Sequence, residues 1–142
     1  MSAQLGEQAP RLWDAYDWWL RRATSIISDS ADALNAMNVF PVPDADTGAN
    51  LKLTMTGIVH SVPTLEQSSA DAAVQAAILC AHGNSGAIVA EMFVSVCRVL
   101  EYDLPDLQSL PPGTMVARLL RSAALAARRA REDSVGDAKS DE

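Results

Sequence analysis

The sequence predicts an all-α fold, and three observations support this prediction. Apolar residues recur about every 3.6 residues in each long segment, which is the period of a helix with one buried face. The same segments are rich in Ala, Leu and Met instead of the β-branched and aromatic residues that strands favour. With 142 residues, 49% of them hydrophobic and 20% charged, the chain is long enough for one domain with a single core.

The negative charge of the chain is concentrated near its C-terminal end. The formal net charge is −7, and residues 132–142 hold five acidic residues and one lysine, which amounts to −4 and leaves −3 for the rest. We therefore expect residues 1–131 to form the domain and residues 132–142 to be a disordered acidic tail. No basic face typical of a nucleic-acid-binding protein is evident, so that class is disfavoured.

The sequence shows no signal for a membrane span or for secretion. No apolar run reaches the roughly 18 residues that a membrane-spanning helix needs, and the first residues lack the pattern of a signal peptide. Cys80 and Cys97 both lie in apolar helical segments, which favours buried free thiols over a disulfide or a metal pair. These features predict a cytoplasmic protein.

The first helix is expected at residues 11–27, where apolar residues form one stripe. The stripe consists of Leu12, Tyr16, Trp19, Leu20, Ala23, Ile26 and Ile27. Trp18 points away from it, so we expect Trp18 to lie on a neighbouring helix, with contact to a partner protein as the alternative. A short helical continuation is expected at residues 29–37. Pro41 and Pro43 then force the chain into an extended path.

The remaining helices show the same apolar spacing. A second helix is expected from about Ala49 until shortly before Pro63, because proline cannot continue a helix. Glycines in "HGNSG" separate a third helix from a fourth, and a proline-containing loop separates the fourth from a fifth. These three helices are expected at residues 70–81, 87–102 and 114–131, which makes about five helices in all.

The segment "PVPDADTGAN", residues 41–50, places two carboxylates directly before a helix. Asp46 could cap that helix and Asp44 could form an Asx-turn, which is the structural explanation for most isolated D-x-D pairs. One cap satisfies the helix end, however, and two carboxylates this close repel each other unless a cation lies between them. Hard cations such as Mg²⁺ bind such oxygens together with substrate phosphates. The pair therefore predicts a magnesium site, with helix capping as the alternative.

Two glycine-containing helix starts provide a candidate phosphate site. Gly48 precedes a helix whose first N–H groups lack intrahelical partners and can bind an anion. In "HGNSG", Gly83 and Gly86 permit a tight backbone, while Asn84 and Ser85 add side-chain donors. Read alone, "GNSG" is an ordinary interhelical turn. Together with the carboxylate pair, the two starts predict a magnesium–polyphosphate site that differs from the P-loop motif.

Two longer segments resemble a known family. Residues 34–55, "LNAMNVFPVPDADTGANLKLTM", and residues 81–93, "AHGNSGAIVAEMF", are similar to the nucleotide-binding domain shared by fatty acid kinases and the L subunit of dihydroxyacetone kinases. The segment "NVFPVPD" is more similar to the fatty acid kinase branch. The resemblance extends over residues 10–131 and implies an antiparallel up-and-down helical barrel of about eight helices, about five of them present here.

The resemblance also implies a role for each matched position. Asp44 and Asp46 would hold magnesium against the phosphates of ATP or ADP. Asn38 stands near a third aspartate of the dihydroxyacetone kinase branch, so its amide oxygen would be a further magnesium ligand or would orient a water. The nucleotide and phosphate contacts would come from Thr47, Gly48, Asn50, Gly83, Asn84, Ser85 and Gly86.

The implied activity is an ATP- and magnesium-dependent phosphotransfer. The γ-phosphoryl group would pass to an acceptor held by a partner, either a fatty acid on a fatty-acid-binding carrier or dihydroxyacetone on its binding protein. No catalytic residue is evident in this chain, so the partner would supply the base that activates the acceptor.

Three departures from the family favour a second hypothesis. Ala45 replaces the usual glycine between the aspartates, and His82 replaces the usual arginine before "GNSG". The segment that would form the last helices of the family domain is absent, so the domain looks C-terminally truncated. The alternative is therefore a non-catalytic nucleotide-binding or helical interaction module. In either case the exposed apolar faces would need a partner chain or a homo-oligomer.

Overall fold

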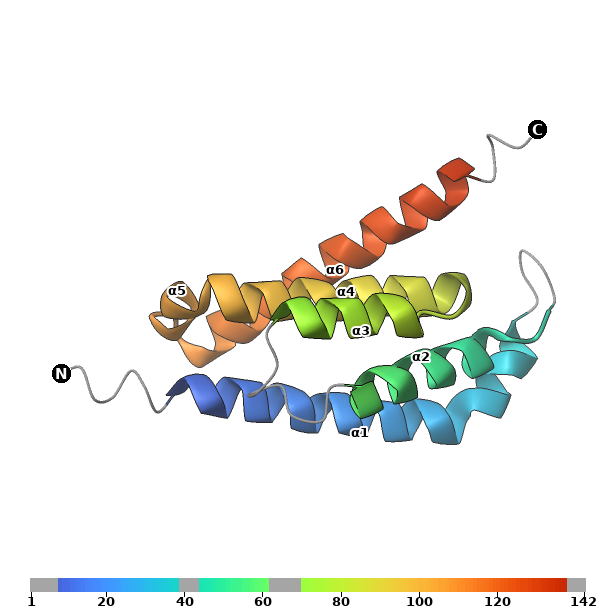
Figure 1. Cartoon of the computed structure of the whole chain (residues 1–142), viewed down its shortest axis with the longest axis horizontal. Helices are drawn as coiled ribbons and strands as arrows, with labels where there is room; N and C mark the ends of the chain where they lie inside the picture. Colours follow the sequence, from blue (N-terminus) through green and yellow to red (C-terminus); the bar gives the residue numbers. More distant parts are fainter. Residues whose placement is uncertain (1–7, 39–43, 62–69, 138–142) are drawn as a thin grey trace.

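The computed structural model describes residues 8–38, 44–61 and 70–137, and these ranges contain no β-strand (Figure 1). The all-α prediction is therefore confirmed. The helices of the described ranges are α1 (Gln8–Met37), α2 (Thr47–Ser61), α3 (Ala70–Cys80), α4 (Gly83–Tyr102), α5 (Leu104–Gln108) and α6 (Pro112–Asp137).

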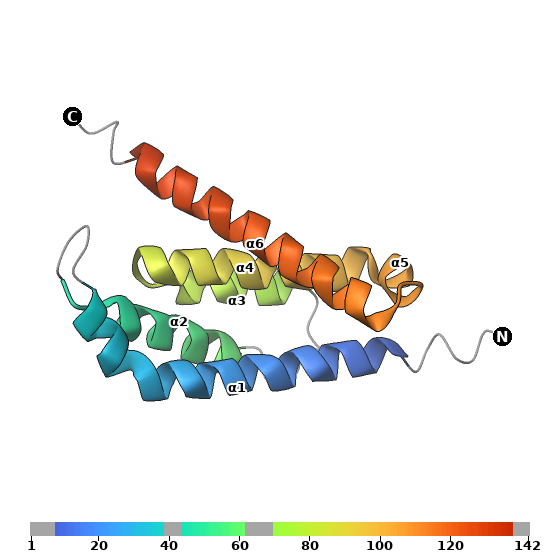
Figure 2. The ribbon, with the colours of Figure 1, turned by 180° about the vertical axis from the view of Figure 1, so that it is seen from behind.

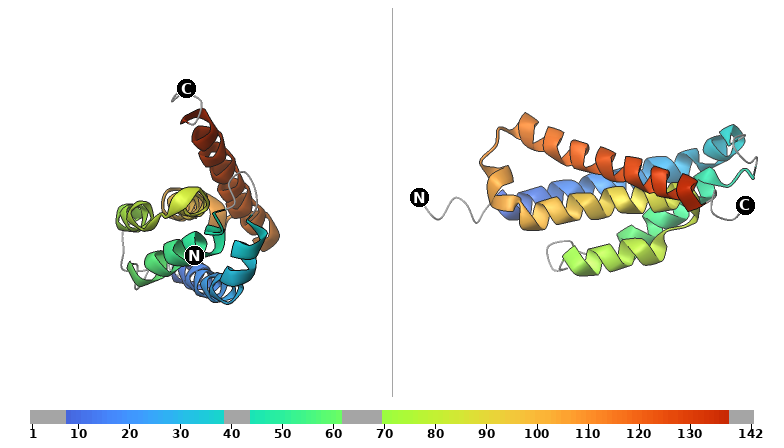
Figure 3. Two further views of the ribbon diagram at one scale, coloured as in Figure 1. Left: turned by 90° about the vertical axis from the view of Figure 1, so that its right-hand side faces the viewer. Right: turned by 90° about the horizontal axis from the view of Figure 1, so that it is seen from above.

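The long helices run alternately in opposite directions. In Figure 1, α1, α3 and α6 run from left to right, while α2 and α4 run from right to left. Seen from behind, α6 crosses α4 at an angle and its C-terminal half projects away from the other helices (Figure 2). Seen along the long axis, α1, α2, α3, α4 and α6 follow one another around the molecule (Figure 3). This is the up-and-down arrangement that the sequence predicts.

Three element boundaries differ from the sequence prediction. The helix at residues 11–27 and its expected continuation form one helix, α1, because neither glycine nor proline interrupts residues 27–37. The expected loop at residues 103–113 contains the short helix α5, with Pro105 in its first turn, where proline is tolerated. Helix α6 ends at Asp137, so the first residues of the expected tail are helical.

Helix α4 lies at the centre of the fold, in contact with α2, α3 and α6. On one side, Phe93 and Cys97 pack with apolar residues of α1, α2 and α3, and Tyr16 of α1 stacks on Phe93 with ring centroids 5.9 Å apart. On another side, Val96 and Leu100 pack with α5 and α6. The first buried cluster consists of Leu20, Met55, Ile58, Ala73, Ala77, Ala90, Phe93, Val94 and Cys97.

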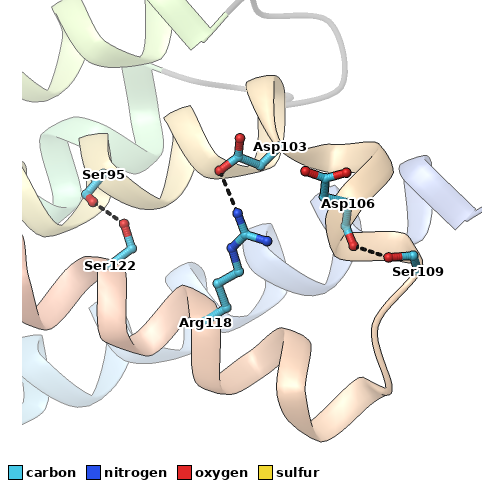
Figure 4. A network of polar contacts seen from close by, with 6 residues as sticks. All are labelled: Ser95, Asp103, Asp106, Ser109, Arg118 and Ser122. Atoms are coloured by element: carbon cyan, nitrogen blue, oxygen red, sulfur yellow. Dashed lines mark hydrogen bonds and ion pairs between the residues drawn. The ribbon is translucent and has the colours of Figure 1, made fainter.

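Polar contacts reinforce the packing of α6 against α4. The hydroxyls of Ser95 and Ser122 are 2.6 Å apart, and Arg118 donates to Asp103 over 3.2 Å (Figure 4). The second contact is between exposed side chains, so it contributes little to stability. The position of α6 therefore depends mainly on its apolar contacts with α4.

Among the described helices, α4 alone is long and apolar enough to cross a membrane. Helices that form the core of a bundle have the same length and hydropathy. Because three other helices pack on α4, its apolar composition is explained by its central position in the fold.

The buried thiol of Cys97 should make the fold sensitive to alkali. Burial, with a smaller effect from the charge of Glu101, raises the pKa of Cys97 to about 12. In the unfolded chain a thiol ionises at about 8.5, so only the unfolded state ionises between these two values. The free energy of unfolding should be unaffected below pH about 8.5 and should have fallen by about 2 kcal/mol at pH about 10.

Denaturant unfolding of the wild type and of Cys97→Ala across this pH range measures the effect. Burial also raises the pKa of Tyr16, so the variant should retain part of the alkaline decline. An identical decline in both proteins would contradict the prediction.

Candidate functional site

The two segments singled out in the sequence lie at the same end of the bundle. This end holds the connection from α1 to α2 and the connection from α3 to α4 (Figure 1). Gly83 lies against the side chain of Asn50, so closely that a Cβ on Gly83 would overlap its amide nitrogen. Residues 44–46, which carry the two aspartates and are called the carboxylate turn below, therefore precede a helix whose first turns lie against the "GNSG" segment.

Helix α2 begins at Thr47, and a side chain from α1 caps it. Oδ1 of Asn35 accepts hydrogen bonds from the backbone N–H of Gly48 at 2.7 Å and of Ala49 at 3.1 Å. These are two of the N–H groups that the sequence analysis offered to a phosphate. In this structure both N–H groups already donate to Asn35, so they are not available for the anion expected at the start of α2.

Gly48 allows α2 to approach α1 at backbone contact. The residue is buried, and a Cβ here would overlap the carbonyl oxygen of Ala31. Gly48 is thus required for packing, whereas the sequence analysis assigned it to phosphate binding. Thr47 and Asn50 remain partly exposed beside it.

Asp44 and Asp46 are both exposed at this end of the bundle. Nδ2 of Asn38 donates to Oδ1 of Asp44 at 2.5 Å, which orients that carboxylate. A carboxylate can only accept, so the Asn38 nitrogen must face it and the Asn38 oxygen is left for other contacts. The backbone carbonyl of Asp46 accepts from Asn50 at 2.8 Å, but within the described residues its carboxylate has no hydrogen-bond partner. The capping explanation for Asp46 therefore finds no support.

Ala45, between the two aspartates, has a left-handed backbone with φ of 55°. This conformation brings Cβ close to the following carbonyl and costs about 1–2 kcal/mol for residues other than glycine. The chain thus carries backbone strain at the position where the family resemblance implies a glycine.

"GNSG" forms the first turn of α4 and is not a turn between helices. Gly83 has φ of 61°, and Gly86 is buried where a Cβ would overlap Oγ1 of Thr54. The same Thr54 hydroxyl accepts from the backbone N–H of His82 at 3.0 Å. The buried hydroxyl of α2 therefore fixes the point at which α4 begins.

The amide groups in the first turn of α4 have no side-chain cap from the residue before the helix. The side chain of His82 makes no capping bond to the helix, and its Nδ1 lies 2.7 Å from the carbonyl oxygen of Cys80. In the part of the chain that the structure describes, no acceptor is found for the N–H groups of Gly83, Asn84 and Ser85. Such N–H groups, at the positive end of a helix dipole, are suited to an anion.

Two residues of this site were missed in the sequence analysis. Asn35 and Thr54 each satisfy backbone N–H groups of a helix that is distant in sequence. A helix-terminal asparagine shortly before a glycine-containing helix start is a weak signal for such a cap. Thr54 gives no signal of its own, because threonines in apolar helices usually bond their own backbone.

The donor set suits magnesium better than a transition metal. Among the described residues, no group of three or more His, Cys, Asp or Glu side chains is placed to hold a metal. Two exposed carboxylates and an amide oxygen match the preference of Mg²⁺, which keeps several waters and binds through one or two carboxylates and substrate phosphates. The unpartnered carboxylate of Asp46 is the observation on which this fit depends.

A family model described as the DAK2 domain matches residues 41–138, which is more than half of the chain. The chain belongs to the DAK2 domain family. The matched region includes both the carboxylate turn and the start of α4, so the resemblance to the dihydroxyacetone kinase and fatty acid kinase family is confirmed at this level.

Curated relatives are similar to this chain over about half of its length. Protein YloV of Bacillus subtilis is 35% identical over 79 residues, and the uncharacterized protein SH1689 of Staphylococcus haemolyticus is 37% identical over 79 residues. Each alignment covers 53% of this chain and 14% of the relative. This chain therefore matches a small part of much longer proteins.

The tight approach of Gly48 predicts a large effect of a small substitution. Gly48→Ala should lower the free energy of unfolding by about 1–3 kcal/mol, because the added Cβ meets a backbone carbonyl that cannot rotate away. Gly113→Ala is the matched control, since nothing lies within 4 Å of a Cβ at Gly113. Urea unfolding of both variants measures the difference, and equal effects would contradict the packing role of Gly48.

The left-handed backbone of Ala45 predicts the opposite outcome. Ala45→Gly should raise the free energy of unfolding by about 0.5–1 kcal/mol, because relief of strain outweighs the larger freedom of glycine in the unfolded chain. Ala124→Gly, at an exposed position in α6, should instead lower it by about 1 kcal/mol. Thermal or urea unfolding measures both, and loss of stability in Ala45→Gly would show that the backbone there is not strained.

Proposed function

We propose that this DAK2 domain is the nucleotide-binding part of an ATP- and magnesium-dependent phosphotransferase. The observation that carries the proposal is the exposed carboxylate of Asp46, which has no hydrogen-bond partner among the described residues, at the end of the bundle where the first-turn N–H groups of α4 likewise find no acceptor among those residues. A carboxylate without a structural partner beside an anion site is suited to a cation that bridges to phosphate.

Asp44, Asp46 and the Asn38 oxygen would hold Mg²⁺, which neutralises charge on the phosphates when it is bound. The N–H groups of Gly83–Ser85 would donate hydrogen bonds to the phosphate oxygens, with the side chains of Asn84 and Ser85 as further donors. Asn50 of α2 lies against Gly83 and would be a further contact, and Thr47 would contribute from the start of the same helix. The chain would thus contribute positioning and charge stabilisation, which is most of what phosphoryl transfer requires.

The phosphoryl acceptor would be held by a partner protein. Both carboxylates and the start of α4 are exposed, so the site is open to a second molecule. The family resemblance suggests a carrier that presents a fatty acid or dihydroxyacetone together with the base that activates it. An activity that consumes ATP also fits a cytoplasmic protein.

Exposed apolar side chains support association with another protein or with a second copy of this chain. Trp18 is 69% exposed, so it does not lie on a neighbouring helix as expected. Large apolar side chains are also exposed on α1 and α6, where no helix of the described structure covers them. Those on these two helices are Trp18, Trp19, Ile26, Met37, Val116, Leu120 and Leu125.

The second candidate function is a non-catalytic nucleotide-binding or interaction module. The strained Ala45 and the exposed His82, whose ring lies by the Cys80 carbonyl, favour it because both differ from the family pattern at the site. Phosphorylation of a fatty acid or dihydroxyacetone in the presence of its carrier would exclude this alternative. Nucleotide binding without turnover would support it.

Calorimetric titration with ADP, with and without Mg²⁺, tests the proposal. The wild type should bind ADP more tightly with magnesium, and Asp46→Ala should lose this gain because one of the metal's carboxylates is removed. Asp71→Ala, which removes an exposed carboxylate from the first turn of α3, should behave as the wild type. Circular dichroism should show equal helical content in all three proteins. Undiminished magnesium-dependent binding by Asp46→Ala would refute the proposed site.

A further inference from the structure

The C-terminal end of α1 holds the carboxylate turn at two points. Asn38 donates to the carboxylate of Asp44 at 2.5 Å, on the near side of the turn. Asn35 accepts from Gly48 at 2.7 Å and from Ala49 at 3.1 Å, on the far side. The segment that carries both aspartates is therefore held at the Asp44 carboxylate by the residue that follows α1, and just after Asp46 by Asn35 of α1.

We propose that Asn35 is a positioning residue for the carboxylate turn, an inference that rests on the proposed function. Asp46 directly precedes α2, and its carbonyl closes the first helical turn by accepting from Asn50 at 2.8 Å. The position of Asp46 thus depends on where α2 begins. The hydrogen bonds from Gly48 and Ala49 to Asn35 hold the start of α2 in place. Asn35 itself touches neither phosphate nor metal in this scheme, because its oxygen is engaged by the two amides.

The hydrogen bonds of Asn35 also distinguish the start of α2 from the start of α4 as a place for phosphate to bind. With the amides of Gly48 and Ala49 taken by Asn35, α2 has no free N–H at these positions for a phosphate. At the start of α4, His82 makes no cap, and the N–H groups of Gly83–Ser85 find no acceptor among the described residues. We therefore assign the phosphates to α4 and the metal to the turn before α2.

Two substitutions separate the hydrogen bonds of Asn35 from its size. Asn35→Leu keeps a side chain branched at the same carbon but removes the acceptor, and Asn35→Asp keeps an acceptor for both amides. Ile27→Val, in α1 and packed against the first buried cluster, is the control for a general loss of stability. Amide hydrogen exchange of Gly48 and Ala49, followed by NMR, reports whether the cap is broken.

Binding of ADP with and without Mg²⁺ is then measured for each protein. Asn35→Leu should expose the amides of Gly48 and Ala49 to exchange and weaken the magnesium-dependent binding about 10- to 100-fold, as for other residues that orient metal ligands. Its affinity for ADP without magnesium should stay unchanged, because the start of α4 is untouched. Asn35→Asp should restore amide protection and magnesium-dependent binding, and Ile27→Val should bind as the wild type.

Three results would overturn the inference. Asn35→Leu could keep its magnesium-dependent binding of ADP although the amide hydrogens of Gly48 and Ala49 exchange freely. That result would show that the cap does not position the carboxylate turn. Asn35→Leu could also lose ADP binding equally with and without magnesium, which would indicate general disruption of the site. If the wild type shows no magnesium-dependent binding, the proposed function fails and this inference fails with it, whereas the first two results leave the proposed function intact.

Discussion

The arrangement of this site depends on close contacts that glycines at the starts of α2 and α4 make with the neighbouring helix. A Cβ on Gly48 would overlap the carbonyl of Ala31, so α2 meets α1 without any intervening side chain. Gly83 and Gly86 bring α4 equally close to Asn50 and Thr54 of α2. Because interiors tolerate almost no added volume at such contacts, the three helices hold one another at fixed positions. The carboxylate turn and the start of α4 are adjacent for this reason.

The first backbone N–H groups of a helix need hydrogen-bond acceptors from outside the helix. The starts of α2 and α4 differ in whether a neighbouring side chain supplies them. Asn35 caps α2 and Thr54 fixes the residue before α4, in both cases from a neighbouring helix. The first turn of α4 itself receives no cap from His82. Among the described residues, N–H groups without acceptors and a carboxylate without a partner therefore lie at the same end of the bundle. Native structures usually leave polar groups unsatisfied where a ligand or solvent completes them.

The rest of the bundle serves to hold this end in place. Helix α4 spans the molecule and contributes to both buried clusters, so its N-terminal turn is anchored by the whole core. The outer sides of α1 and α6 contribute less, since several of their large apolar residues remain exposed. Exposed apolar surface of this kind is typical of contact regions between proteins. The molecule thus combines a rigid site at one end with lateral faces suited to association.

The sequence by itself determined the helical class, the approximate helix positions and the two segments that form the site. These follow from local patterns, because helical period and glycine position are properties of neighbouring residues. Only the tertiary structure decided which helix start is free to bind an anion. The hydrogen bonds that decide it join residues 13 and 28 positions apart, Asn35 to Gly48 and Thr54 to His82. Such caps depend on how helices pack, and no local pattern specifies which side chain will reach which backbone group.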